Sequence, residues 1–157
     1  MQSEMPGAVN PLLGQSGMTR ADIVAFFDRR QEHYDDLDAA ALAADYADDA
    51  IIESRIAGVH TGPAAAENTF RAVFAAFLDC TIKTESLLID GDKVAQALTF
   101  EGTHIGEFMG LSPTHKSFRI HVVCLYELRD QKIIHERRIY DFTGLLMQIG
   151  VLKAKPV

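Results

Sequence analysis

The chain has 157 residues, of which 48% are hydrophobic and 24% charged, which is the profile of a folded globular protein with room for one buried core. Its net charge of -7 and its isoelectric point near 5.3 argue against nucleic acid or an anionic membrane as a partner. No apolar run is long enough to span a membrane and no secretory signal precedes the first helix, so we expect a cytoplasmic protein. Cys80 and Cys124 lie in apolar segments and are expected to be reduced core residues.

The N-terminal half is predicted to be mainly helical. Residues 1–17 lack hydrophobic periodicity and are expected to form a flexible arm before a single domain at residues 18–157. Thr19, with Asp22 three residues later, is a capping-box pattern that predicts a helix to about residue 34. The elements expected next are a second helix capped by Asp38, a short strand at 51–56, a loop at 58–62 and a third helix that begins at Pro63.

The C-terminal half is predicted to contain long strands. Apolar runs broken by short polar turns predict two hairpins, with strands at 81–89, 93–103, 118–128 and 133–140. Phe142, Leu145, Leu146 and Ile149 then have the spacing of a short helix, and Gly150 follows as its stop. Antiparallel strands with helices on one side predict an α+β fold, in which a curved, mostly antiparallel sheet of about five to six strands and three helices enclose a pocket.

Asp141 stands where the last predicted strand passes into the last predicted helix. An aspartate directly before an amphipathic helix is a favoured N-cap. A carboxylate with a pKa raised by apolar walls can instead remove a proton next to a carbonyl group. The residue type alone leaves both roles open.

The residues around this junction resemble a known family. The pattern Gly102-x-His104-x-Gly106-x-Phe108-x-Gly110-x-x-Pro113-Thr114, followed by Asp141 and Leu146-x-Gln148-Ile149-Gly150, is similar to that of the SnoaL-like polyketide cyclases of the NTF2-like superfamily. The resemblance implies an α+β cone and an intramolecular aldol ring closure of a small hydrophobic carbonyl compound. It also implies Asp141 as the general acid/base, with no metal and no organic cofactor.

Four further residues are expected to bind the substrate. An enolate or alkoxide needs a hydrogen-bond donor, and His104, His121 and Arg137 are the candidates. Glu53 is expected to point into the cone opposite Asp141. The structural alternatives are a backbone partner for His104, a surface or interface position for His121, a dimer-facing polar stripe for Arg137 and a surface ion pair for Glu53.

Other motifs carry little chemistry. The six histidines show no metal-ligand spacing such as HExxH, so we expect no metal site. The glycines at 102, 106 and 110 lack the βαβ context of a dinucleotide site. His60 is expected only to support its loop.

The uncovered face of a curved sheet is predicted to be a homodimer interface, because large exposed apolar patches usually mark contacts between proteins. The candidates for it are Phe118, Ile120, Val122, Ile134 and Tyr140, unless the two faces of the sheet are exchanged.

Alternative functions also stay open. The same fold would suit a non-catalytic protein that binds small molecules, an epoxide-hydrolase-like enzyme, or a structural module that dimerises through its sheet. An enclosed Asp141 with a raised pKa would favour the cyclase, whereas an exposed, capping Asp141 would favour the structural module.

Overall fold

The protein is described by a computed structural model that covers residues 17–154, so the arm predicted at residues 1–17 lies outside this part except for Gly17. Within residues 17–154, no helix is long and apolar enough to cross a membrane.

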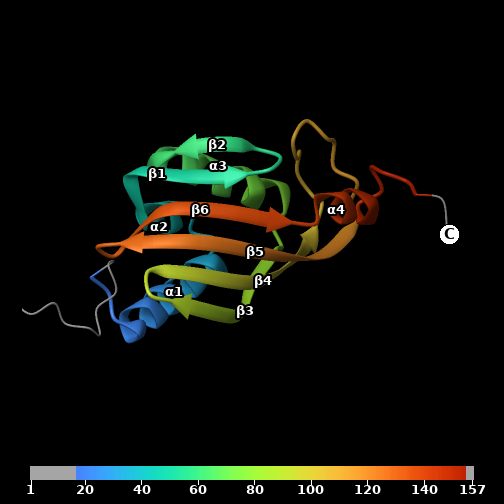
Figure 1. Cartoon of the computed structure of the whole chain (residues 1–157). Coiled ribbons are helices and arrows are strands. Elements are labelled where there is room, and N and C mark those ends of the chain that lie inside the picture. The colour runs from blue at the N-terminus through green and yellow to red at the C-terminus, as the bar shows by residue number, and fades with distance from the viewer. Residues whose placement is uncertain (1–16, 155–157) are drawn as a thin grey trace, which may run out of the picture.

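A six-stranded sheet forms the centre of the molecule (Figure 1). Its strands lie in the order β2-β1-β6-β5-β4-β3. Their bounds are β1 Tyr46–Ser54, β2 Gly58–Thr61, β3 Thr81–Asp90, β4 Lys93–Thr103, β5 Ser117–Arg129 and β6 Lys132–Tyr140. Every neighbouring pair is antiparallel except β1 with β6, which is parallel. The predicted α+β fold with a mostly antiparallel sheet is confirmed.

Three helices, α1 Arg20–Asp35, α2 Ala39–Ala44 and α3 Gly62–Ala76, lie behind one face of the sheet in Figure 1. The capping box predicted for α1 is present, because Thr19 Oγ1 accepts a hydrogen bond from Asp22 N and Asp22 Oδ2 accepts one from Thr19 N. The Asp38 cap of α2 is also present, with Ala41 N as donor at 2.9 Å. The covered face is called the inner face below, and the opposite one the outer face.

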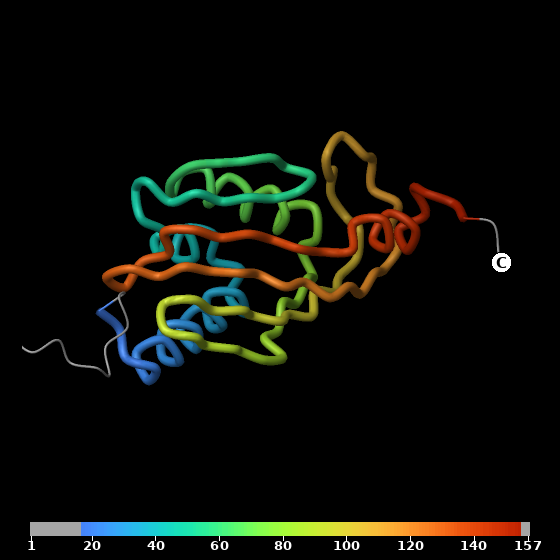
Figure 2. The backbone as a smooth tube through the Cα atoms, in the orientation of Figure 1, coloured from blue at the N-terminus to red at the C-terminus, as the bar shows by residue number. Residues whose placement is uncertain are grey.

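A fourth helix, α4 Phe142–Gln148, follows β6 directly. The loop at residues 104–116 reaches the same end of the sheet (Figure 2), and its Phe108 ring lies 6.4 Å from that of Phe142 in α4. Gln148 links α4 to β5 by two hydrogen bonds. Its Oε1 accepts one from Arg119 N at 2.7 Å, and its Nε2 donates one to Arg119 O at 3.0 Å. Loop and helix therefore close one end of the space between the sheet and the helices.

Two elements differ from the sequence prediction. Strand β1 begins at Tyr46 instead of 51, and residues 58–61, expected as a loop, form the short edge strand β2. This segment has no alternation of apolar and polar residues. It becomes a strand because it pairs with the open edge of β1, as in the register Glu53↔Val59.

The apolar side chains of β5 point inward. Phe118 and Ile120 are each only 4% exposed and belong to the core. The assignment of these residues to the uncovered face of the sheet is wrong, and the two faces are exchanged. Exposed Val123, Leu125 and Ile139 occupy the outer face instead.

A β-bulge in β6 decides which of its residues face inward. Glu127 pairs with His135 and Leu128 with Ile133, so Ile134 has no directly opposite partner. The extra residue reverses the alternation. Ile133 is fully buried, but His135 turns outward and Glu136 turns inward.

Candidate active site

An internal cavity of about 500 Å³ lies between the inner face of the sheet and α3, within the usual size range of small-molecule sites. Its lining includes Tyr34, Ser54, Ala57, His60, Ala65, Asn68, Thr69, Phe70, Ala72, Val73, Phe77, Ile82, Leu98, Phe100, Phe108, Met109, Ile120, Val122, Cys124, Glu136, Arg138, Tyr140 and Leu145. Apolar side chains make most of the wall, and a few polar groups interrupt it.

One side of the cavity is aromatic. The Phe77 ring packs against Phe100, Phe108 and Phe118 with centroid distances of 5.7, 5.0 and 4.8 Å. Phe77 at the end of α3, Phe100 in β4 and Phe108 in the loop at 104–116 line the cavity, whereas Phe118 in β5 packs against them in the core. Such a wall suits a planar apolar ligand, because ring stacking adds to the gain from burial.

Strand β6 contributes polar groups to the cavity. Glu136, Arg138 and Tyr140 follow each other at a spacing of two and all line the cavity. Their neighbours His135, Arg137 and Ile139 alternate with them and face outward. The bulge at Ile134 sets this choice of face.

Glu136 and Arg138 form a buried ion pair. Arg138 Nε lies 2.8 Å from Glu136 Oε1 and Nη2 lies 3.1 Å from Oε2, while Tyr46 also donates its hydroxyl hydrogen to Oε2. Burial alone would raise the pKa of Glu136, but the charge and hydrogen bonds of Arg138 and the Tyr46 hydroxyl bring the pKa below its ordinary value. Glu136 is therefore an ionised group that holds Arg138 in place.

Arg138 is the cation of the cavity. Its side chain is 14% exposed and its guanidinium lies 5.0 Å from the centre of the Phe70 ring. Nε and Nη2 make its hydrogen bonds, and Nη1 has no hydrogen-bond partner among residues 17–154. Nη1 is thus a free donor in a largely apolar space, where a hydrogen bond to an oxyanion is stronger than in water.

A second pair of polar groups lies beside Arg138. The hydroxyls of Tyr140 and Ser54 are 2.9 Å apart, and either can be the donor. Ser54 in β1 stands opposite Arg138 in the parallel register of β1 and β6. The two hydroxyls and the guanidinium therefore belong to one patch of the inner face.

His60 is the imidazole that lines the cavity. It lies on the edge strand β2, is half-buried, and its Nε2 is 2.8 Å from the carbonyl oxygen of Ala57. This bond matches the expected supporting role in its loop. The same side chain also reaches the cavity, which the sequence did not indicate.

Asp141 lies outside the residues that line the cavity. It is exposed and caps α4, with its Oδ1 accepting from Gly144 N at 2.8 Å. A β-carbon added at Gly144 would clash with the Asp141 carboxylate in this position, so the cap as it stands needs glycine there. The Asp141 carboxylate does not point into an apolar pocket, as the catalytic role would require. It caps a helix, as in the alternative role.

Three of the four expected substrate-binding residues lie on the outer face. Glu53 Oε2 is 2.6 Å from His135 Nε2 and 3.1 Å from Arg137 Nη2. These hydrogen bonds, first from His135 and then from Arg137, lower the pKa of Glu53. His121 is 73% exposed and lies 3.7 Å from Glu85. The sheet separates all three from the cavity.

His104 is fully buried but lies behind the aromatic wall, with its ring 5.9 Å from that of Phe77. Its Nδ1 accepts a hydrogen bond from Thr114 N at 3.3 Å, which leaves the ring hydrogen on Nε2. That Nε2 has no hydrogen-bond partner among the residues described. His104 supports the loop at 104–116, as the backbone-partner alternative expected.

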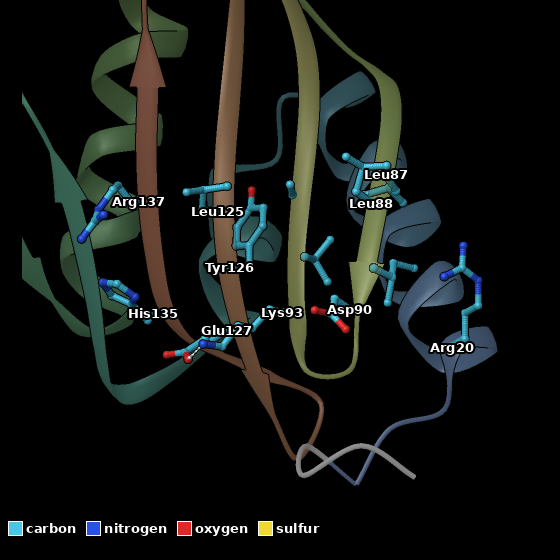
Figure 3. Close-up of a pocket in the computed structure, with 13 residues that line it drawn as sticks. Arg20, Leu87, Leu88, Asp90, Lys93, Leu125, Tyr126, Glu127, His135 and Arg137 are labelled. Atoms are coloured by element: carbon cyan, nitrogen blue, oxygen red, sulfur yellow. Dashed lines mark ion pairs between the residues drawn. The ribbon is translucent and has the colours of Figure 1, made fainter. Parts of the chain in front are cut away.

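The outer face also carries a groove of about 710 Å³ (Figure 3). Figure 3 shows His135 and Arg137 on one side of it, Leu125 between them and Leu88, and a dashed line for the ion pair of Lys93 and Glu127. The two charged groups of that pair are 3.4 Å apart. Lys93 is paired with Glu127, and His135 and Arg137 are paired with Glu53, while the groove itself lies on the uncovered side of the sheet. We therefore place the candidate active site in the internal cavity.

Within residues 17–154, no group of three or more His, Cys, Asp or Glu side chains is arranged to hold a metal ion. Cys80 and Cys124 are free and buried, as expected. Burial, with a smaller contribution from the nearby Glu136 charge, raises the pKa of the Cys124 thiol to about 12. The thiol stays protonated at neutral pH.

The fold is that of the NTF2-like proteins, and solved structures with ketosteroid isomerase-like and NTF2-like folds share it. In this α+β fold a cavity that is partly open to solvent lies between the sheet and the helices. The chain matches the family of SnoaL-like polyketide cyclases over residues 25–149, and it belongs to that family.

Individual relatives share part of the sequence or the fold. The aklanonic acid methyl ester cyclase AcmA of Streptomyces galilaeus is 36% identical over 59 residues, which is 38% of this chain and 41% of AcmA. The match therefore spans less than half of that relative. AclR from Streptomyces galilaeus, a proposed hydroxylase, shares the fold with a TM-score of 0.77 at 24% identity, covering 88% of this chain and 91% of AclR. IdmH, a proposed polyketide cyclase from Streptomyces antibioticus, does so with a TM-score of 0.68 at 25% identity, covering 82% and 98% of the two chains.

Proposed function

We propose that the protein is a cyclase that closes a ring in a small, polyketide-like carbonyl compound by an intramolecular aldol reaction inside the cavity. The observation that carries the proposal is the guanidinium of Arg138, held by Glu136 and Tyr46 with Nη1 free, in a cavity with an aromatic wall. Membership of the cyclase family and the partial similarity to AcmA support the same class of substrate.

An aldol ring closure needs three events at the site. A proton leaves the carbon next to one carbonyl group, and the resulting enolate carbon forms a bond to a second carbonyl carbon of the same molecule. The new alkoxide then takes up a proton, so substrate and product have the same composition. Negative charge appears on an oxygen in both intermediates, and donors placed at that oxygen lower the barrier.

Arg138 and Tyr140 are the donors we assign to that oxygen. Arg138 stays charged at every pH of interest, and its Nη1 can donate a hydrogen bond to a new partner without any rearrangement of the side chain. Tyr140 can turn its hydroxyl hydrogen from Ser54 to the substrate. The aromatic wall formed by Phe77, Phe100 and Phe108 would hold the apolar part of the same molecule.

The resemblance to the family assigns the proton transfer to an aspartate, and Asp141 is its match in this chain. As a cap of α4 its carboxylate is already bonded to Gly144 N, and it would have to leave that partner to reach a ligand in the cavity. The geometry thus favours a proton acceptor among the residues that line the cavity.

Turnover of aklanonic acid methyl ester, the compound named for AcmA, tests the proposal. We expect a product of unchanged mass and altered retention in chromatography with mass detection. Arg138→Lys and Tyr140→Phe are expected to lower kcat by about 10²–10³-fold, the usual effect of removing an oxyanion donor. Unfolding midpoints confirm that both variants are folded under the assay conditions.

Arg137→Lys is the matched comparison, because Arg137 is the neighbour of Arg138 on the outer face. Its kcat should equal that of the wild type. A large loss for Arg137→Lys with none for Arg138→Lys would overturn the site. Binding of the ester without any product would favour the non-catalytic alternative.

A further inference from the structure

We propose that His60 is the catalytic base of the cavity and that its Nδ1 removes the proton next to the substrate carbonyl group. This inference rests on the proposed function, and it names the group that the proposed reaction still lacks. It follows from the geometry of His60 and from the state of the other polar groups in the cavity.

The other candidates for a base are engaged or protonated. Glu136 is ionised, but its two oxygens accept hydrogen bonds from Arg138 and Tyr46, which makes it a weak proton acceptor. Cys124 keeps its proton, as described above. Hydroxyl groups of Ser, Thr and Tyr act as donors near neutral pH, because even a phenol titrates only at about pH 10. An imidazole is the side chain whose ordinary pKa suits a base at neutral pH.

The hydrogen bond of His60 fixes which ring nitrogen can act. A carbonyl oxygen only accepts hydrogen bonds, so Nε2, at 2.8 Å from Ala57 O, must carry the ring hydrogen. In the neutral imidazole, Nδ1 then holds the free lone pair.

The position of His60 fits the task. His60 pairs with Ile52 across β2 and β1, and Ile52 pairs with Glu136 across β1 and β6. Adjacent strands lie about 4.8 Å apart, so His60 stands about 10 Å along the inner face from the backbone of Glu136. His60 and the oxyanion donors thus line the same cavity from strands two places apart in the sheet, which leaves room for a substrate between them.

The charges around His60 are few. Glu136 and Arg138 are the charged residues among those that line the cavity, and they neutralise each other. On α3, which packs against β2, Glu67 pairs with Arg71. On β1, Glu53 pairs with His135 and Arg137 on the outer face.

The step is balanced without a co-reactant. Nδ1 takes the proton as the C–H bond breaks, and the electron pair moves through the carbon to the carbonyl oxygen, where Arg138 and Tyr140 donate hydrogen bonds. After the new C–C bond forms, the imidazolium returns the proton to the alkoxide. The free base is thereby restored.

Exchange of the α-hydrogens of 2-tetralone in D₂O, followed by proton NMR, tests this step alone. The wild type should catalyse exchange at a measurable rate. His60→Gln, whose amide can still donate to Ala57 O, should lose about 10²–10⁴-fold in rate. His60→Ala should lose as much and regain rate when imidazole is added, which a purely structural role would not produce. His33→Ala, at a half-buried position of α1 that does not line the cavity, should leave the rate unchanged.

A His60→Gln protein that exchanges within threefold of the wild type overturns the role of His60, while the loss in Arg138→Lys would still stand for the proposed function. An unfolding midpoint shows that each variant is folded. A wild type that catalyses no exchange and turns over no ester overturns the proposed function, and the role of His60 with it.

Discussion

Replacing Glu136 by glutamine should destabilise the protein strongly. Glu136 is 1% exposed, and its carboxylate is the partner of the Arg138 guanidinium, which is itself largely buried. Glutamine keeps the size of the side chain but removes its charge. Arg138 would then be a buried cation without a counter-ion, with Nε and Nη2 bonded at best to a neutral amide oxygen.

The expected cost is about 3–5 kcal/mol, which is typical when one member of a buried ion pair is removed. Urea unfolding of a domain of this size has a slope of about 1–3 kcal/mol per molar. With a slope of about 2, the midpoint should fall by about 1.5–2.5 M. Equilibrium urea unfolding followed by circular dichroism measures this shift directly.

Glu67→Gln is the matched control. Glu67 and Arg71 form an exposed pair one turn apart on α3, and losing it should cost only about 0.3–0.5 kcal/mol. The double variant Glu136→Leu with Arg138→Met removes both charges, and we expect most of the stability to return, although activity should not. A Glu136→Gln midpoint as close to the wild type as that of Glu67→Gln would refute the reasoning.

The ion pair of Glu136 and Arg138 should also make the free energy of unfolding depend on pH. Because the folded-state pKa of Glu136 is lowered, its contribution to stability is complete above its unfolded pKa of about 4.3. It is lost as the pH falls through the lower, folded-state pKa. The difference in unfolding free energy between wild type and Glu136→Gln should therefore stay constant above about pH 5 and shrink at lower pH.

Two further predictions concern Asp141 and the outer face. Asp141→Ala should cost about 0.5–2 kcal/mol of stability through loss of the α4 cap, and Asp141→Asn much less, while both keep turnover. An Asp141→Asn protein of unchanged stability without turnover would instead establish Asp141 as the general acid/base. We also expect a homodimer through the outer face, because Val123, Leu125 and Ile139 are exposed there. Light scattering should then show that Leu125→Lys is monomeric, and a wild type that is monomeric at micromolar concentration would contradict the interface.

Local patterns in the sequence were enough to predict most of the helices and strands. The Thr19 and Asp38 caps, the two hairpins and the helical spacing after Asp141 all depend on neighbours a few residues apart, and the structure contains each of them. The short strand β2 is the exception. It forms only because β1, a segment with its own bulge, presents an open edge to it.

Local sequence patterns could not predict which side chains face the cavity. The sequence alternation of β6 is the same whether Asp141, Arg137 and His135 face inward or Tyr140, Arg138 and Glu136 do. The bulge at Ile134, created by pairing with β5, selects the second set. The same sheet places Glu53 and His121 outside.

The composition of the chain thus determined a single apolar core, and its periodicities determined helices and strands, because both properties belong to the chain itself. Tertiary structure decided the register between strands and therefore the face on which each side chain lies. It brought His60, Ser54, Glu136 and Arg138 to one cavity from three strands. In a sheet, a shift of one residue moves every later side chain to the opposite face, so the catalytic candidates could be identified only after the strands were paired.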